Sequence, residues 1–347
     1  MEVTDRFLRA ANRLPVDATP VWFMRQAGRY MPEYRAIREK YSLLEICHQP
    51  ELAAEVTLQP VRALGVDAAI LFADILLPAI PLGVGLEFAK GEGPILQKPV
   101  RSMQDVHNLR PVDPETDLGY VMAAIRSLRG QLTAIPLIGF CGAPFTVASY
   151  LIEGGSTREF LKTKAMMYSE PATWHALMEK LSIVLTDYLL AQIGAGAQTV
   201  QVFDSWIGTL NAADYVEFVQ PYSRRILQAA QAAGVPVIHF GTGASTLLPA
   251  MKAAGGTVLG LDWRIPLDDG WKLVGADVAI QGNLDPALLF APLPEIKKRV
   301  HDILRRAEGR PGHIFNLGHG ILQNTPVDTV KAVVDMVHEF SFERLSA

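Results

Sequence analysis

Short runs of apolar, mostly β-branched or aromatic residues recur along the chain, and each is followed by a polar or glycine-containing loop. Continuous apolar runs of this kind are typical of strands that are buried on both faces, as in parallel sheets. The pattern predicts eight strands, at residues 19–24, 68–73, 136–140, 199–203, 236–240, 257–261, 278–281 and 313–317.

Stretches with helical spacing of apolar residues lie between these runs, most clearly at residues 171–193, 212–233, 294–307 and 327–340. Eight strands alternating with helices predict an α/β fold of the (β/α)8 TIM-barrel type in a single domain, residues 1–347. A doubly wound open sheet would have fewer strands and is the alternative. A hairpin-like excursion is expected at residues 86–112, after the second strand.

The overall charge limits the partners. The chain of 347 residues is 49% hydrophobic and 20% charged, and its formal net charge is −4. A protein without a basic field is a poor partner for nucleic acid or for an anionic membrane. An anionic ligand would therefore be held by a local cluster of cations.

Cysteine usage and hydropathy indicate a cytoplasmic protein. Cys47 and Cys141 are far apart and lack the spacing of metal ligands, so neither a disulfide framework nor a metal site is expected. The most apolar stretch, residues 66–86, is interrupted by aspartates and prolines, so no membrane span is expected there. The N-terminal residues lack the apolar core of a signal peptide.

The loop after the first predicted strand carries two arginines, Arg25 and Arg29, separated by a glycine that permits a tight turn. Active sites of barrels lie at the C-terminal ends of the strands. The guanidinium fork matches a carboxylate with two parallel hydrogen bonds, which a lysine cannot do. We therefore interpret these two arginines as anion binders. For Arg35 and Arg38, further along, an exposed helix start with salt bridges is an equal alternative.

Asp74 ends the second predicted strand among apolar neighbours. Burial alone would raise its pKa and favour the neutral acid, whereas N–H donors of a ligand would restore the anion. The residue is either a hydrogen-bonded structural group or a reactive one, and its place at a strand end favours the second interpretation.

Three further strand-end loops carry candidate ligand contacts. Tyr150 follows the third strand, but core packing is its simpler interpretation. Ser205 lacks the Gly-x-Ser-x-Gly surroundings of a hydrolase nucleophile, so it is a candidate hydrogen-bonding group. His319 lies between two glycines that would let a ligand approach. Residues 241–243, Gly-Thr-Gly, lack the third glycine of a dinucleotide fingerprint, although N–H groups there could hold an anion.

Several of these segments together resemble the uroporphyrinogen decarboxylase family. The resemblance runs from Asn12 to about His338 and is most specific at residues 22–30, Trp-Phe-Met-Arg-Gln-Ala-Gly-Arg-Tyr. Residues 72–76, Phe-Ala-Asp-Ile-Leu, are also among its most specific elements, and residues 142–146 and 316–320 add to it.

The resemblance implies a (β/α)8 barrel, usually a homodimer, that uses no cofactor and no metal. It implies decarboxylation of the four acetate side chains of uroporphyrinogen III to coproporphyrinogen III and CO2, in haem biosynthesis. A substrate with eight carboxylates explains arginines in a protein without basic excess. Asp74 and Arg25 would be catalytic, with Asp74 accepting hydrogen bonds from the pyrrole N–H groups. The implied substrate-binding residues are Arg25, Gln26, Ala27, Gly28, Arg29, Asp74, Tyr150, Ser205 and His319.

Two other functions remain as alternatives. Thiol methyltransferases acting on corrinoids have a similar fold but use a zinc set with His-x-Cys, where this chain has His239-Phe240-Gly241 and no cysteine. A tetrapyrrole carrier without activity would need the arginines but not Asp74.

Overall fold

A parallel sheet lies at the centre of the computed structural model, which describes residues 6–89 and 93–340. Its seven strands follow the order β1-β4-β5-β6-β7-β8-β9, and all neighbours are parallel. The strands are almost wholly buried, as their apolar runs predicted. They are β1 (Ala69–Ile70), β4 (Leu137–Gly142), β5 (Thr199–Asp204), β6 (Val237–Gly241), β7 (Val258–Gly260), β8 (Ala279–Gln281) and β9 (His313–Ile314).

The prediction of strands is confirmed for seven of the eight runs and is wrong for the first, residues 19–24. That segment forms a single parallel bridge, between Val21 and Phe315. Its backbone still meets both edges of the sheet, because Phe315 N–H donates to Pro20 O at 2.8 Å and Asp67 N–H donates to Val21 O at 2.8 Å. Pairing stays short because Pro20 has no N–H to donate and a turn follows within a few residues.

A buried polar network joins side chains on the concave side of the sheet. The indole N–H of Trp22 donates to Gln281 Oε1 at 2.9 Å, and Gln281 Nε2 donates to Gln201 Oε1 at 3.1 Å. Gln201 belongs to β5 and Gln281 to β8, which are separated by two strands in the sheet. Contact between them shows that the sheet is strongly curled.

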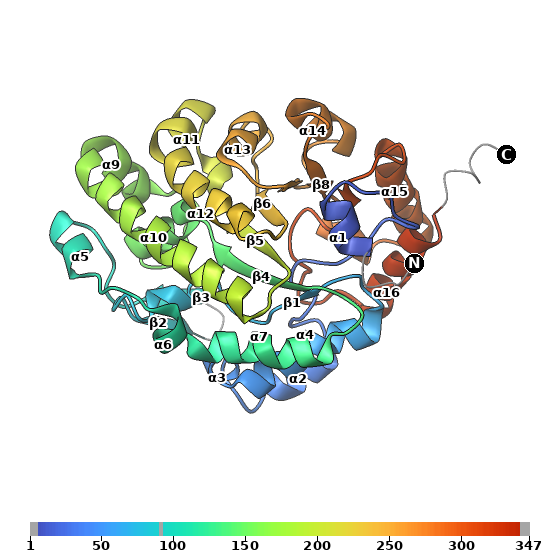
Figure 1. Cartoon of the computed structure of the whole chain (residues 1–347), viewed down its shortest axis with the longest axis horizontal. Helices are drawn as coiled ribbons and strands as arrows, with labels where there is room; N and C mark the ends of the chain where they lie inside the picture. The colour runs from blue at the N-terminus through green and yellow to red at the C-terminus, as the bar shows by residue number, and fades with distance from the viewer. Residues whose placement is uncertain (1–5, 90–92, 341–347) are drawn as a thin grey trace.

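Helices surround the strands on the outside (Figure 1). In α15 the buried residues are Ile296, Val300, Ile303 and Leu304, which share one helical face, while lysines and arginines face outward. The helices of this outer layer are α4 (Pro50–Leu64), α7 (Gly119–Gln131), α10 (Pro171–Ala195), α12 (Gln220–Ala232), α13 (Leu248–Ala254), α14 (Leu267–Val274), α15 (Leu293–Arg306) and α16 (Val327–His338).

The remaining helices are short. They are α1 (Arg6–Ala11), α2 (Pro32–Arg38), α3 (Leu43–His48), α5 (Met103–Asn108), α6 (Pro114–Asp117), α8 (Pro144–Glu153), α9 (Leu161–Ser169), α11 (Ala212–Phe218) and the 3₁₀ turns η2 (Leu77–Ala79), η3 (Ile207–Thr209) and η4 (Pro286–Phe290). The single helix predicted at residues 212–233 is two helices, α11 and α12, which break at Val219. Pro221 explains the break, because proline cannot donate within a helix and its ring clashes with the carbonyl four residues earlier.

The excursion after β1 is a hairpin in its first half only. Strands β2 (Leu86–Ala89) and β3 (Gly93–Leu96) pair antiparallel, as predicted, and residues 90–92 of the expected turn lie outside the described residues. The second half of the stretch at 86–112 carries α5 instead.

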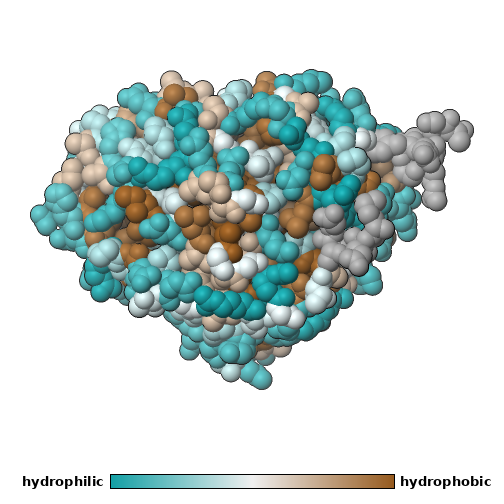
Figure 2. Space-filling view, in the orientation of Figure 1, coloured by the Kyte–Doolittle hydropathy of each residue, from teal (hydrophilic) through white to brown (hydrophobic). Residues whose placement is uncertain are grey.

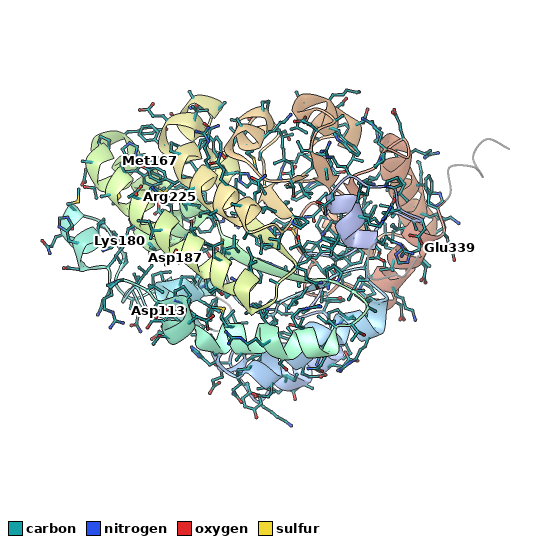
Figure 3. The ribbon with its side chains drawn as sticks, in the orientation of Figure 1. Asp113, Met167, Lys180, Asp187, Arg225 and Glu339 are labelled. Atoms are coloured by element: carbon teal, nitrogen blue, oxygen red, sulfur yellow. The ribbon has the colours of Figure 1, made fainter. Side chains whose placement is uncertain are left out.

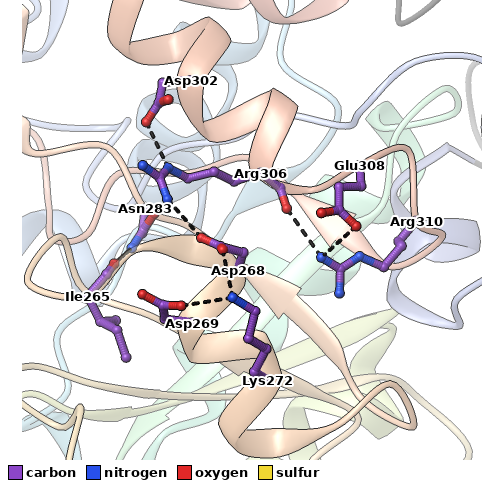
Figure 4. Close-up of polar contacts among 9 residues, drawn as sticks. All are labelled: Ile265, Asp268, Asp269, Lys272, Asn283, Asp302, Arg306, Glu308 and Arg310. Atoms are coloured by element: carbon purple, nitrogen blue, oxygen red, sulfur yellow. Dashed lines mark hydrogen bonds and ion pairs between the residues drawn. The ribbon is translucent and has the colours of Figure 1, made fainter.

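Charged side chains connect neighbouring helices at the periphery. Lys180 on α10 donates to the carbonyls of Val106 and Leu109 at the end of α5, at 3.0 and 2.5 Å (Figure 3). Arg306 on α15 contacts Asp268 on α14 at 2.9 Å (Figure 4). Such partly exposed pairs contribute little individually, so the apolar helix faces dominate the stability. No helix in the described ranges is both long and apolar enough to cross a membrane.

We predict that Gln281→Leu destabilises the protein by about 1–3 kcal/mol, because the buried Trp22 N–H loses its acceptor. The free energy of unfolding in urea measures the loss. Gln131→Leu on the exposed end of α7 is the control, and an equal effect of both changes would contradict the role of the network.

Candidate active site

The candidate residues lie in loops that leave the C-terminal ends of the parallel strands. Asp74 follows β1, Tyr150 lies on α8 directly after β4, Ser205 follows β5, and His319 lies in the loop after β9. Arg25 follows the bridging segment around Val21. Because parallel strands all end at the same edge of a sheet, these five side chains come from one side of the protein.

The segment from Arg25 to Arg29, the arginine loop, is held in place by the buried side chain of Gln26. This side chain is fully buried, accepts from Phe23 N–H at 3.0 Å and donates to Ala68 O at 3.0 Å. Arg25 itself has a left-handed backbone, with φ of 61°, which a side-chain-bearing residue rarely adopts. A Cβ atom at Gly28 would lie 2.9 Å from Arg25 O, so the turn needs a glycine there. Gln26 and Gly28 therefore shape the loop, and Ala27 lies half-buried between them.

Arg25 and Arg29 are exposed and, within residues 6–89 and 93–340, form no ion pair. Surface arginines elsewhere do, for example Arg62 with Glu55 at 3.0 Å and Arg126 with Glu115 at 2.9 Å. An unpaired arginine at a strand end is a free anion-binding group. The arginine loop therefore has the charge that an anionic ligand requires.

The side chain of Arg25 lies over Gly320. A Cβ atom at Gly320 would be 2.7 Å from Arg25 Cγ, so only a glycine leaves room for the arginine there. The Arg25 charge also acts on Asp74, on Tyr150 and on His319. Arg25 is thus the residue whose charge acts on three of the other candidates.

Asp74 is half-buried and has one uncommitted oxygen. Its Oδ1 accepts from Leu76 N–H at 2.8 Å, and in the described part of the chain no donor reaches the other oxygen. Burial raises the pKa of Asp74, while the Leu76 N–H and the Arg25 charge oppose the rise. The direction agrees with the expectation for a carboxyl among apolar neighbours.

Tyr150 stacks against Trp206, with ring centroids 3.8 Å apart. Burial, with the Asp74 charge, raises the pKa of Tyr150 to about 12, so its hydroxyl keeps its proton. Ser205 precedes Trp206 and is half-buried. The aromatic pair therefore connects Ser205 to the group around Asp74.

His319 is a hydrogen-bond donor in this site. Its Nδ1 accepts from Gly320 N–H at 2.8 Å, so the hydrogen of the neutral ring is on Nε2. Burial lowers the pKa of His319 to about 4, and the charges of Arg25 and Arg264 act in the same direction. The ring is therefore neutral near pH 7.

Arg29 is related to Asp74 less directly than the other candidate residues are. Its charge acts on Tyr34, whose ring lies 5.4 Å from that of Phe72, two residues before Asp74. Arg38 donates to Tyr41 O at 2.6 Å, and Arg35 is exposed.

Asp204, at the end of β5, is a buried carboxyl that was not predicted from the sequence. Its Oδ1 accepts from Thr146 Oγ1 at 2.8 Å, its Oδ2 has no partner in the described chain, and Thr146 Oγ1 in turn accepts from Trp206 N–H at 3.3 Å. Burial raises the pKa of Asp204 to about 7. Its place one residue before Ser205, at a strand end, was the available signal.

A zinc site of the methyltransferase kind has no support from the residues present. His239, in the corresponding position, is fully buried in β6, and neither ring nitrogen has a hydrogen-bond partner in the described chain. Among residues 6–89 and 93–340, no group of three or more His, Cys, Asp or Glu could hold a metal ion.

Fold and site together define a parallel α/β protein with unpaired arginines and a half-buried carboxyl at the strand ends. The family model described as "Uroporphyrinogen decarboxylase (URO-D)" matches residues 2–340. The chain therefore belongs to the uroporphyrinogen decarboxylase family, which are carboxy-lyases of tetrapyrrole biosynthesis.

Curated relatives agree with this family. A uroporphyrinogen decarboxylase of Sorangium cellulosum is 61% identical over 335 residues, which cover 96% of each chain. One of Solibacter usitatus is 55% identical over 339 residues, covering 97% of this chain and 98% of the relative.

Among solved structures, a methyltransferase from Methanosarcina mazei is similar with a TM-score of 0.82 at 19% identity, covering 100% of both chains. A B12-independent methionine synthase from Shewanella sp. W3-18-1 has a TM-score of 0.60 at 11% identity, covering 88% of this chain and 92% of that one. At these identities the likeness concerns the fold alone.

Gly320→Ala is expected to displace Arg25 without unfolding the protein, because the new methyl group meets a side chain. We expect kcat/KM for uroporphyrinogen decarboxylation to fall at least about tenfold, which is the equivalent of one charge-assisted hydrogen bond. The melting temperature should be unchanged. Gly318→Ala is the matched contrast, because its methyl group would meet the backbone of Asp262 and Trp263 and so lower stability. The same pattern of loss in both variants would refute the packing of Arg25 on Gly320.

Asp204→Asn tests the raised pKa of the buried carboxyl. The folded pKa of about 7 exceeds the ordinary 3.8, so the folded state holds the proton longer and wild-type stability falls as pH rises from about 4 to 7. Asparagine does not titrate and can still accept from Thr146. The stability of Asp204→Asn relative to wild type should therefore rise from pH 5 to pH 7, by up to about 1.4 kcal/mol per pH unit. Urea unfolding at several pH values measures it, and a difference independent of pH would disprove the raised pKa.

Proposed function

We propose that this chain decarboxylates uroporphyrinogen III, converting its four acetate side chains to methyl groups and yielding coproporphyrinogen III and CO2 without a cofactor. The observation that carries the proposal is the uncommitted oxygen of half-buried Asp74, which lies within the electrostatic reach of the unpaired Arg25. Membership of the decarboxylase family supports the reaction.

Arg25 and Arg29 bind carboxylate arms of the substrate, and Asp74 accepts hydrogen bonds from pyrrole N–H groups in its centre. Tyr150 and Ser205 offer hydroxyl groups, and His319 donates through Nε2–H to a carboxylate. Gln26, Ala27 and Gly28 complete the binding segment by setting its backbone path.

The substrate itself supplies the electron sink. A proton adds to the ring carbon next to the one that bears the acetate. The CH2–CO2 bond then breaks, and its electrons form an exocyclic C=CH2 bond that neutralises the cationic pyrrole. CO2 leaves, the exocyclic CH2 takes a second proton to become a methyl group, and the ring loses one proton, so one proton is consumed for each CO2. Asp74 stabilises the cationic pyrrole: one charge pair at about 4 Å and an effective dielectric of about 20 contributes about 4 kcal/mol. That corresponds to about a thousandfold in rate.

Positioning of the leaving carboxylate lowers the activation barrier further, beyond the contribution of Asp74. Arg25 orients the acetate carboxylate, which is the catalytic role that we assign to it. His319 is neutral near pH 7 because of its lowered pKa, so it contributes as a hydrogen-bond donor and not as an acid.

The proposal extends to architecture. The segment around Val21, with hydrogen bonds to both sheet edges, completes a closed (β/α)8 barrel in one domain.

The protein acts in the cytoplasm as a homodimer. Apolar residues gather in small groups among polar ones on the face in Figure 2, and exposed Leu161 and Tyr168 on α9 with Val216 on α11 offer apolar area for a second copy.

Asp74→Asn keeps the shape of the side chain and removes its charge, so the cationic intermediate loses its counter-charge. We expect CO2 release from uroporphyrinogen to fall by about a thousandfold while the substrate is still bound. Product analysis under anaerobic conditions measures release.

Asp187→Asn on the exposed face of α10 is the control and should retain wild-type activity (Figure 3). The proposal is abandoned if the wild type releases no CO2. It is also abandoned if Asp74→Asn remains fully active.

A further inference from the structure

A pocket of about 350 Å³ lies next to the candidate active site, at the ends of β5, β6 and β7. Ser205 and Trp206 line it, so it is continuous with the group around Tyr150. Asp74, Arg25 and His319 do not line it. The other lining residues are Thr157, Phe160, Gly208, Thr209, Thr242, Gly243 and Arg264.

Arg264 is the cationic residue of this pocket, and its guanidinium is held in place. Its Nη1 contacts Asp262 Oδ2 at 2.5 Å, and the guanidinium carbon lies 4.0 Å from the centre of the Trp263 ring. The side chain is 48% exposed and lines the pocket, and only one of its five N–H donors has a partner among the described residues, Asp262. An oriented guanidinium loses little further entropy when it binds an anion.

The loop that carries Arg264 is fixed from behind. Asn283 Nδ2 donates to Asp262 O and to Ile265 O, both at 2.7 Å (Figure 4 shows Asn283 beside Ile265). A Cβ atom at Gly318 would touch the backbone at Asp262 and Trp263, so the loop also packs on the residue before His319. Arg264 therefore has a defined position relative to the site.

The Gly-Thr-Gly segment lines this pocket with Thr242 and Gly243 and is not an anion site of its own. Gly243 N–H, expected to be open to an external anion, donates to Asp262 Oδ2, and α13 begins only at Leu248. The hydroxyl of Thr242 is buried and has no partner in the described chain. A ligand oxygen in the pocket therefore meets Ser205 and the Arg264 guanidinium.

We propose that this pocket binds a non-reacting carboxylate arm of the tetrapyrrole substrate, with Arg264 as its cation. The inference rests on the proposed function for the identity of the ligand. An arm in this pocket lies away from Asp74 and Arg25, where the reaction occurs. We assign it as a propionate, because the propionates remain through all four decarboxylations and are retained by the product. The pocket therefore contributes binding energy that is the same for substrate, transition state and product, and it determines specificity for a ligand with an acidic arm.

Arg264→Gln tests the proposal. Loss of a charge-assisted hydrogen bond should raise KM for uroporphyrinogen about 10- to 100-fold, with the loss in KM and not in kcat. The inhibition constant of coproporphyrinogen should rise by the same factor, since it has the same arm. Arg264→Lys keeps the charge but not the fork, so it should recover part of the affinity.

Arg299→Gln on the exposed face of α15 is the matched control, because it removes an arginine paired with Glu295 far from the pocket. Melting temperatures are measured for all variants. A fall in kcat or in melting temperature without a loss of affinity for coproporphyrinogen would show that Arg264 only supports its loop, and would overturn the inference.

Direct binding of coproporphyrinogen, measured by anaerobic calorimetry, separates the two proposals. If the wild type binds it but releases no CO2, the proposed function fails, while weaker binding by Arg264→Gln still supports the pocket. If the wild type is active and Arg264→Gln binds coproporphyrinogen with unchanged affinity, the pocket inference fails alone.

Discussion

Parallel pairing of the seven strands is the constraint on which the site depends. Hydrogen bonds in register, such as those that align Val202 with Cys141 and His239, bring all the strand ends to one edge. Residues that are more than two hundred positions apart, such as Asp74 and His319, can then act on a common ligand although no hydrogen bond joins them. The curled sheet draws these ends toward one another, and the Trp22–Gln281–Gln201 network fills the concave side beneath them.

Carboxyl groups in this protein differ in function because they differ in partners. Asp67 is buried but accepts from Arg6, from Val21 N–H and from His338, so it joins α1, the first segment and α16 as a structural group. Asp262 likewise has both oxygens engaged by donors. Among residues 6–89 and 93–340, no donor reaches the second oxygen of Asp74, and the cation that acts on it is Arg25, which leaves its charge available to a ligand.

The local sequence pattern was sufficient to predict a residue's structure or role where its neighbours in sequence determine its environment. The buried run at 199–203 could be predicted as a strand, and Arg25, Asp74 and His319 could be predicted as candidates because each follows such a run. Long-range partners could not be predicted: Asp204 meets Thr146, 58 residues away, and only the fold reveals that pairing. The resemblance implies that Gln26 is a substrate-binding residue, and only the fold shows that its side chain bonds inward to Phe23 N–H and Ala68 O.

The hydrogen bond from Gly320 N–H to His319 Nδ1 has a consequence for the kind of molecule the site admits. With one ring nitrogen permanently occupied by a backbone donor, the imidazole cannot exchange its tautomer to suit an incoming group. The His319 ring therefore acts as a hydrogen-bond donor through Nε2–H, and not as an acceptor, at neutral and at alkaline pH alike. At this ring a carboxylate would find a donor, whereas an ammonium group would find no acceptor, because Gly320 N–H already occupies Nδ1.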